Sequence, residues 1–147
     1  MSHPYFREDT LLGNLSEVAQ RHKIPYEISN STEGYEYLSD LAQLYEFGTG
    51  LLPEVTYSYR QQCESARYGF EYAGHLVSLI MEISNRKHAI CLFNHLNSFT
   101  GSHVFILPQA SDLLKLFQKA QPCDYFMSDM SGSFMLAANW HSFTYAT

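Results

Sequence analysis

Residues 125–137 of this chain read YFMSDMSGSFMLA, and this stretch decides the fold. An apolar run at Tyr125–Met127 is separated from a second apolar run at Phe134–Ala137 by the polar turn Met130–Ser133. Two apolar runs of strand length around a short turn that contains glycine are typical of a β-hairpin. The stretch therefore predicts an antiparallel sheet in the second half of the chain.

The residues on either side of this hairpin extend the predicted sheet. Ala89–Phe93 and His103–Leu107 are compact apolar runs of strand length, and Phe143–Tyr145 supplies a last short strand. Pro108 opens a helix that ends near Gln121, because its apolar residues recur at helical spacing with lysines between them. The second half is thus a sheet interrupted by one helix.

The first half of the chain is predicted to be mostly helical. One helix covers Leu11–His22 and a second about Thr32–Glu46, behind the N-cap candidates of Asn30–Glu33 and ended by Gly48. In a strand after Pro53, three residues share the buried face: Val55, Tyr57 and Tyr59. A long helix follows at Glu64–Ser84, and its expected buried side is Phe70, Ala73, Val77, Ile80 and Met81.

This order of elements predicts a single α+β domain over residues 1–147. We expect an antiparallel sheet packed on one face by three to four helices. The length of 147 residues suits one domain, and an apolar content of 46% is enough to fill one core.

Charge and cysteine content narrow the class of protein. Fifteen acidic residues against nine basic ones give a net charge of −6, and residues 1–74 hold eleven of the acids and five of the bases. An acidic chain is a poor electrostatic partner for nucleic acid. No secretory signal or membrane span is visible, and Cys63, Cys91 and Cys123 are widely spaced. We therefore expect a cytoplasmic protein that binds neither nucleic acid nor membrane.

Catalytic signatures are missing from the sequence. It has no nucleophile elbow and no phosphate-binding loop. Asp124 and Asp129 stand at opposite ends of a predicted strand, about 16 Å apart, which is too far for a glycosidase pair. We therefore predict no catalytic residue, no cofactor and no enzymatic activity.

Four histidines support an alternative interpretation. His88, His95, His103 and His141 lie near the ends of predicted strands, although none has the spacing of a helical ligand pair. The alternatives are a small metal-binding enzyme with histidine ligands and a regulatory ligand-binding domain. A third interpretation is a module that oligomerises through its aromatic strands.

The second predicted helix carries the main candidate binding surface. At about 100° per residue, Glu33, Glu36 and Asp40 fall on one face of it. Three further residues flank this acidic stripe: Tyr35, Tyr37 and Glu46. One interpretation is that this stripe is only the solvent-exposed face of the helix. The functional one is a docking surface for a basic protein, since carboxylates steer association and tyrosines supply contact area.

Residues 88–145 resemble bacterial immunity proteins, the antidotes of contact-dependent and polymorphic toxin systems. The segments that carry the resemblance are Leu107-Pro108, Asp112-Leu113-Leu114, Asp124-Tyr125-Phe126, Ser133-Phe134-Met135-Leu136 and Asn139-Trp140-His141. Where the resemblance leads us to expect an acid after this last element, the chain has Ser142.

The resemblance implies that the protein inhibits a cognate toxin domain by binding it tightly, without an enzymatic step. We therefore predict an immunity protein that acts as a monomer or homodimer. The expected partner-binding residues are Glu33, Tyr35, Glu36, Tyr37, Asp40 and Glu46.

Overall fold

The computed structural model describes residues 11–48, 53–60, 65–69, 73–94, 103–120, 122 and 124–147. Within these ranges the main element is a seven-stranded sheet in which all neighbouring strands are antiparallel. In spatial order its strands are β1 (Glu27–Ile28), β6 (Phe105–Leu107), β5 (Ile90–Phe93), β7 (Tyr125–Asp129), β8 (Met135–Ala138), β9 (Ser142–Ala146) and β4 (Ala66–Gly69). A separate hairpin pairs β2 (Tyr45–Phe47) with β3 (Val55–Ser58).

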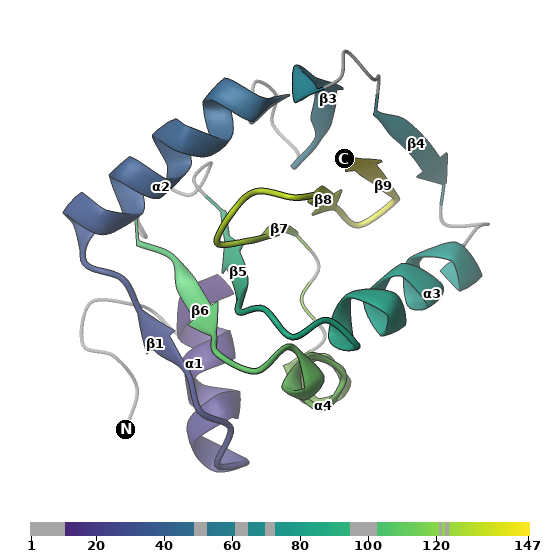
Figure 1. Cartoon of the computed structure of the whole chain (residues 1–147). Coiled ribbons are helices and arrows are strands. Elements are labelled where there is room, and N and C mark those ends of the chain that lie inside the picture. The colour runs from purple at the N-terminus through teal and green to yellow at the C-terminus, as the bar shows by residue number, and fades with distance from the viewer. Residues whose placement is uncertain are drawn as a thin grey trace.

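Helices and the small hairpin cover both faces of this sheet (Figure 1). On one face pack α1 (Leu11–Arg21), α3 (Ala73–Ser84) and α4 (Leu113–Ala120), the last preceded by the short 3-10 helix η3 (Ala110–Asp112). On the other face pack α2 (Ser31–Leu44) and the β2–β3 hairpin. The sheet is therefore the middle layer of three.

The central strands show this two-sided burial residue by residue. In β5, Ile90 and Leu92 belong to the core beneath α1, α3 and α4, whereas Cys91 and Phe93 belong to the core beneath α2. Successive side chains of a strand point to opposite faces, so a strand that is covered on both faces must be apolar throughout. This explains why the central strands occur in the sequence as unbroken apolar runs instead of alternating ones.

The predicted fold class is confirmed. The chain forms an α+β domain with an antiparallel sheet, and the hairpin of residues 125–137 is present as β7–β8. Three helices pack on one face, as expected. The opposite face is also covered, because α2 turns its own apolar residues toward the sheet from the other side.

The predicted long helix at Glu64–Ser84 is wrong in its first part. Residues Ala66–Gly69 form the edge strand β4, which pairs with β9, and the helix α3 begins only at Ala73. Pairing with a strand 73 to 79 residues further along the chain cannot be seen in a local apolar pattern. Phe70 lies outside the described residues, as does the side chain of Ala73.

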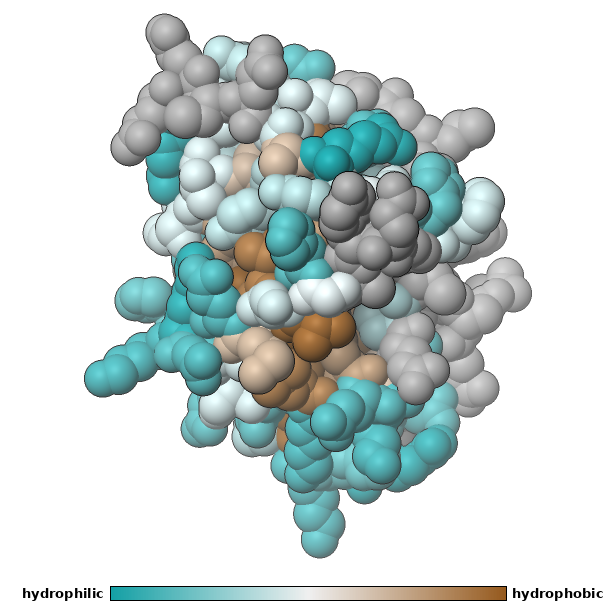
Figure 2. All heavy atoms as spheres, turned by 90° about the vertical axis from the view of Figure 1, so that its right-hand side faces the viewer, coloured by the Kyte–Doolittle hydropathy of each residue, from teal (hydrophilic) through white to brown (hydrophobic). Residues whose placement is uncertain are grey.

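The buried side of α3 also differs from the predicted one. Ile80 and Ile83 are buried, but Val77 and Met81 are 55% and 51% exposed. Figure 2 views the side of the molecule that carries α3, and apolar side chains gather at its centre. In the described part of the chain, no helix is long and apolar enough to cross a bilayer.

The two sides of α3 predict opposite responses to truncation. Ile80→Ala should lower the free energy of unfolding by about 2–4 kcal/mol, because it leaves a cavity in the core. Val77→Ala should change it by less than about 0.5 kcal/mol, because the side chain is exposed. Urea denaturation measures both values. Equal losses in the two variants would contradict this placement of the helix.

Candidate functional site

The candidate site is built on α2, whose start is fixed by a side-chain cap. Asn30 is the N-cap residue, and its Oδ1 accepts a hydrogen bond from the backbone N–H of Glu33 at 2.8 Å. Asparagine at this position satisfies one of the unpaired N–H groups of the first turn. The carboxylate of Glu33 in the same turn complements the positive end of the helix dipole.

The acidic stripe on α2 faces solvent. Glu33, Glu36 and Asp40 are all exposed, and they fall within about 60° of one another around the helix. Tyr35 is also exposed, at 66%, but it lies about 100° from Glu36 on the opposite flank. The structure therefore brings the three carboxylates together, and it places Tyr35 on the other flank of the exposed side of the helix.

Tyr37 points in another direction. Its ring packs edge-on against Phe93, with 6.0 Å between the ring centroids, and its hydroxyl donates to the carbonyl of Asp129 at 2.8 Å. Burial, together with the neighbouring Cys91 thiol, raises the pKa of Tyr37 well above its usual value. Tyr37 thus faces the sheet and holds the helix in place.

Tyr45 makes a second attachment of the same kind at the end of the helix. This residue is buried at the start of β2, and its hydroxyl donates to the carbonyl of Gly132 at 2.6 Å. Burial raises the pKa of Tyr45 to about 12. The two tyrosines anchor α2 and the start of the hairpin to the turn between β7 and β8.

That turn is organised by the carboxylate of Asp129, which is almost fully buried. Its Oδ1 accepts from the backbone N–H groups of Ser131 and Ser133 at 3.1 and 2.9 Å and from the Ser131 hydroxyl at 3.0 Å. Its Oδ2 accepts from the Ser133 hydroxyl. Burial alone would raise the pKa of Asp129, but these hydrogen bonds outweigh it and lower the pKa.

Gly132 in the same turn allows α2 to approach closely. Its φ of 69° is in the left-handed region that favours glycine. A Cβ atom on this residue would lie 2.8 Å from Cδ1 of Leu44 and 3.0 Å from Cδ2 of Leu41. Both leucines belong to the sheet-facing side of α2, so a side chain at this position would force these leucine side chains to shift.

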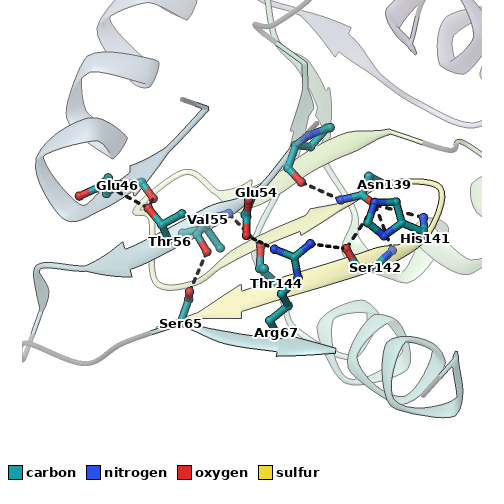
Figure 3. Close-up of polar contacts among 11 residues, drawn as sticks. Glu46, Glu54, Val55, Thr56, Ser65, Arg67, Asn139, His141, Ser142 and Thr144 are labelled. Atoms are coloured by element: carbon teal, nitrogen blue, oxygen red, sulfur yellow. Dashed lines mark hydrogen bonds and ion pairs between the residues drawn. The ribbon is translucent and has the colours of Figure 1, made fainter. Parts of the chain in front are cut away.

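A polar network at the far end of the sheet fixes the β2–β3 hairpin (Figure 3). Asn139 is buried, and its Oδ1 accepts from the backbone N–H groups of His141 and Ser142 while its Nδ2 donates to the carbonyl of Pro53. The Val55 N–H donates to the Thr144 hydroxyl at 2.8 Å, and Arg67 pairs with Glu54. These bonds join the start of β3 to β9 and to the turn before it.

Trp140 follows Asn139 in the chain but is not part of this network. The residue sits between Asn139 and His141 in the β8–β9 turn and is 65% exposed, with its ring centroid 4.5 Å from that of His141. Trp140 is the single tryptophan of the chain.

Glu46 extends the acidic surface onto the hairpin. It is exposed on β2 opposite Tyr57, and its carboxylate accepts from the hydroxyls of Thr56 at 3.0 Å and Tyr59 at 3.3 Å. Tyr59 was expected on the buried face with Val55, but it is 51% exposed and stacks edge-on against Tyr57. Ser58 is the buried residue instead, because a register shift between Glu46 and Phe47 interrupts the alternation along β3 and pairs Ser58 with the buried Tyr45.

Sequence reasoning missed one more exposed residue near α2. Met130 follows Asp129 in the β7–β8 turn and is 58% exposed. Its Sδ atom lies 3.3 Å from the Sγ atom of Cys91. We use the term acidic face for seven exposed residues on α2, on the β2–β3 hairpin and in this turn: Glu33, Tyr35, Glu36, Asp40, Glu46, Tyr59 and Met130.

The carboxylates of α2 have no positive partner in the described part of the chain. Neither of the ion pairs formed there, Arg21 with Glu17 and Arg67 with Glu54, involves α2. The acidic face therefore presents its negative charge to solvent, where a partner's cations can reach it.

Three of the four histidines of the alternative interpretation lie in the described part of the chain, and they do not form a metal site there. Among the described residues, no three histidine, cysteine, aspartate or glutamate side chains are placed to hold a metal ion. His103 places its Nδ1 2.8 Å from the carbonyl of Ser29, and His141 lies in the β8–β9 turn. His88 is exposed in the turn before β5, and His95 is outside the described residues.

The thiol of Cys91 is poorly suited to nucleophilic chemistry. It is buried in β5, and burial raises its pKa to about 12. A thiol at this pKa is almost entirely protonated at neutral pH, and the thiolate is the reactive form. The other two cysteines, Cys63 and Cys123, lie outside the described residues.

Comparison with protein-family models, with curated proteins and with solved structures found no match to this chain.

The hydrogen bonds of Asp129 predict a stability effect that depends on pH. Asp129→Asn should lower the free energy of unfolding by about 1–3 kcal/mol at pH 7, because it removes a charged acceptor of four hydrogen bonds. A lowered pKa in the folded state stabilises the fold above the usual carboxyl value of 3.8. This stabilisation is lost as the pH falls through the folded-state pKa, so the difference should shrink in acid.

Denaturation by urea at several pH values measures this effect. Glu36→Gln is the matched control, because it removes one carboxylate that makes no hydrogen bond to the described structure. A penalty for Asp129→Asn that stays constant from pH 7 down to about pH 2 would contradict the proposed role of the charge.

Proposed function

We propose that the chain is a non-enzymatic binding protein of the immunity type, which neutralises a cognate toxin domain by docking the acidic face against a basic surface. The observation that carries this proposal is the group of exposed carboxylates on α2 that lack a positive partner in the described part of the chain. The toxin as partner follows from the resemblance of residues 88–145 to immunity proteins. In this proposal the protein acts in the cytoplasm as a monomer or homodimer.

Electrostatics supports docking to a basic partner. The chain carries a net charge of −6, and Glu33, Glu36 and Asp40 concentrate part of it on one helix. Such a surface raises the rate of encounter with a cationic partner and repels other acidic proteins. A basic active site that binds a polyanionic substrate is a partner of this kind, and an acidic protein would compete with that substrate.

The contacts that fix α2 to the sheet support tight binding. Its cap, the attachments of Tyr37 and Tyr45 and the close approach to Gly132 fix the helix before any partner arrives. A rigid surface loses little conformational entropy when it binds. Tyr35, Tyr59 and Met130 add exposed apolar area to the acidic face, and tyrosine is enriched among the residues that dominate binding energy.

Charge reversal on α2 tests this proposal. Co-expression with the product of the neighbouring gene, followed by purification through a tag on this chain, should give a stoichiometric complex. With that complex in hand, Glu36→Lys together with Asp40→Lys should slow association about tenfold or more at low salt. Surface plasmon resonance at two ionic strengths measures the rate, and the difference should narrow at high salt because charges are screened.

A matched control separates local from global charge effects. Glu82 is exposed on α3, on the opposite side of the sheet, so Glu82→Lys alters charge away from the acidic face. It should leave the association rate within about twofold of the original, as expected for a charge remote from the contact. If the α2 variants keep full affinity and rate, the acidic face is not the docking surface. If the neighbouring product forms no complex, the immunity function itself is overturned.

A further inference from the structure

A second surface lies across the sheet from the acidic face. A cavity of about 370 Å³ opens between the turn that follows α3 and the turn that connects β6 to η3. Its polar lining comes from both turns: Ser84, Asn85, Arg86 and Lys87 from the first, and Gln109 and Ser111 from the second. Its volume is at the lower end of the range for small-molecule pockets, roughly 300–1,000 Å³.

The lining of this cavity is rich in hydrogen-bond donors. Arginine and lysine donate only, and the amide and hydroxyl side chains beside them also have protons to give. None of the described residues that line the cavity carries a carboxylate, although the chain contains fifteen acidic residues. The nearest acid along the chain, Asp112, is the residue just beyond the lining. A donor-rich cavity without a carboxylate suits a ligand that carries several acceptor oxygens and a negative charge.

Two of the four basic residues in the second half of the chain line the cavity. Residues 75–147 contain four lysines and arginines, of which Arg86 and Lys87 line the cavity while Lys115 and Lys119 lie on α4. The acidic face is on α2, which packs on the other side of the sheet. The cavity is thus a positive site on an otherwise acidic protein.

Arg86 is held in position by the sheet. Its guanidinium carbon lies 4.8 Å from the centre of the Phe134 ring, and its Nη1 donates to the Ser133 hydroxyl at 3.3 Å. Behind Ser133 lies Asp129, whose carboxylate is already bound by hydroxyl and backbone donors. A side-chain hydrogen bond also joins Arg86 to Tyr145. Arginine has five donors in a planar group that matches phosphate geometry, so donors remain beyond the bonds to Ser133 and Tyr145.

We propose that this cavity binds the phosphate group of a small phosphate monoester, with Lys87 and Arg86 as its cationic contacts. Lys87 is exposed at the cavity and supplies a mobile charge, and Arg86 supplies a fixed one. The remaining volume accommodates the organic part of the ester. This inference is independent of the proposed docking function, because the two surfaces lie on opposite faces of the sheet.

An NMR titration with glycerol phosphate, at constant ionic strength, tests the proposal. The backbone amides of residues 84–87 and 109–112 should shift in a saturable manner, and glycerol alone should shift none of them. Lys87→Gln should weaken binding by about fivefold or more, because a charged hydrogen bond is lost. Lys87→Arg should restore most of the affinity.

Lys119→Gln is the matched control, because it removes one exposed positive charge from α4 without altering the cavity lining. It should change the affinity by less than about twofold. Three results would each overturn the proposal: shifts that do not saturate, equal weakening by Lys87→Gln and Lys119→Gln, or inorganic phosphate binding as tightly as glycerol phosphate. Shifts that do not saturate, or equal weakening by the two variants, would show only non-specific electrostatic attraction. Equally tight binding of inorganic phosphate would show that the organic part of the monoester is not recognised.

Discussion

The buried carboxylate of Asp129 is central to how the layers of this protein are held together. It closes the β7–β8 turn by accepting bonds from Ser131 and Ser133, and this turn meets both layers of the protein. Toward α2, the carbonyls of Asp129 and Gly132 receive the hydroxyls of Tyr37 and Tyr45. Toward the other face, Ser133 receives Arg86. One buried charge thus sets the position of a helix on one side of the sheet and of a guanidinium on the other.

A sheet that is covered on both faces imposes a second constraint. Its central strands have no polar side to expose, so the layers outside it must carry the charges that face solvent. The first half of the chain supplies the acids of α2, and the second half supplies the bases of α4 and of the turn that follows α3. Separation of charge between the two outer layers therefore follows from chain order and from which face each helix covers.

Local sequence patterns predict those parts of the fold that local physics determines. The β7–β8 hairpin, the strands β5 and β6, and α1 and α2 follow from apolar spacing and from caps such as Asn30. The strand β4 could not be predicted in this way, because its partner is β9 and its own residues look helical. The coverage of the second face was missed for a related reason, since the apolar stripe of α2 does not say which face of the sheet it meets.

For the candidate site, helical spacing correctly groups Glu33, Glu36 and Asp40, but it gives no sign that Tyr37 reaches a carbonyl 92 residues away. The exposure of Tyr59 and Met130 also depends on tertiary contacts that spacing does not report.

The position of Trp140 has a consequence for spectroscopy. The single indole of the chain stands on the β8–β9 turn, in contact with solvent and beside the imidazole of His141. Its emission therefore reports the polarity of its surroundings at the surface, and it is nearly insensitive to the integrity of the core. The aromatic reporters of the core are tyrosines and phenylalanines, including Tyr45, Tyr125 and Phe126. Near-ultraviolet circular dichroism in the tyrosine region will consequently follow unfolding, whereas tryptophan fluorescence will follow events at one tip of the sheet.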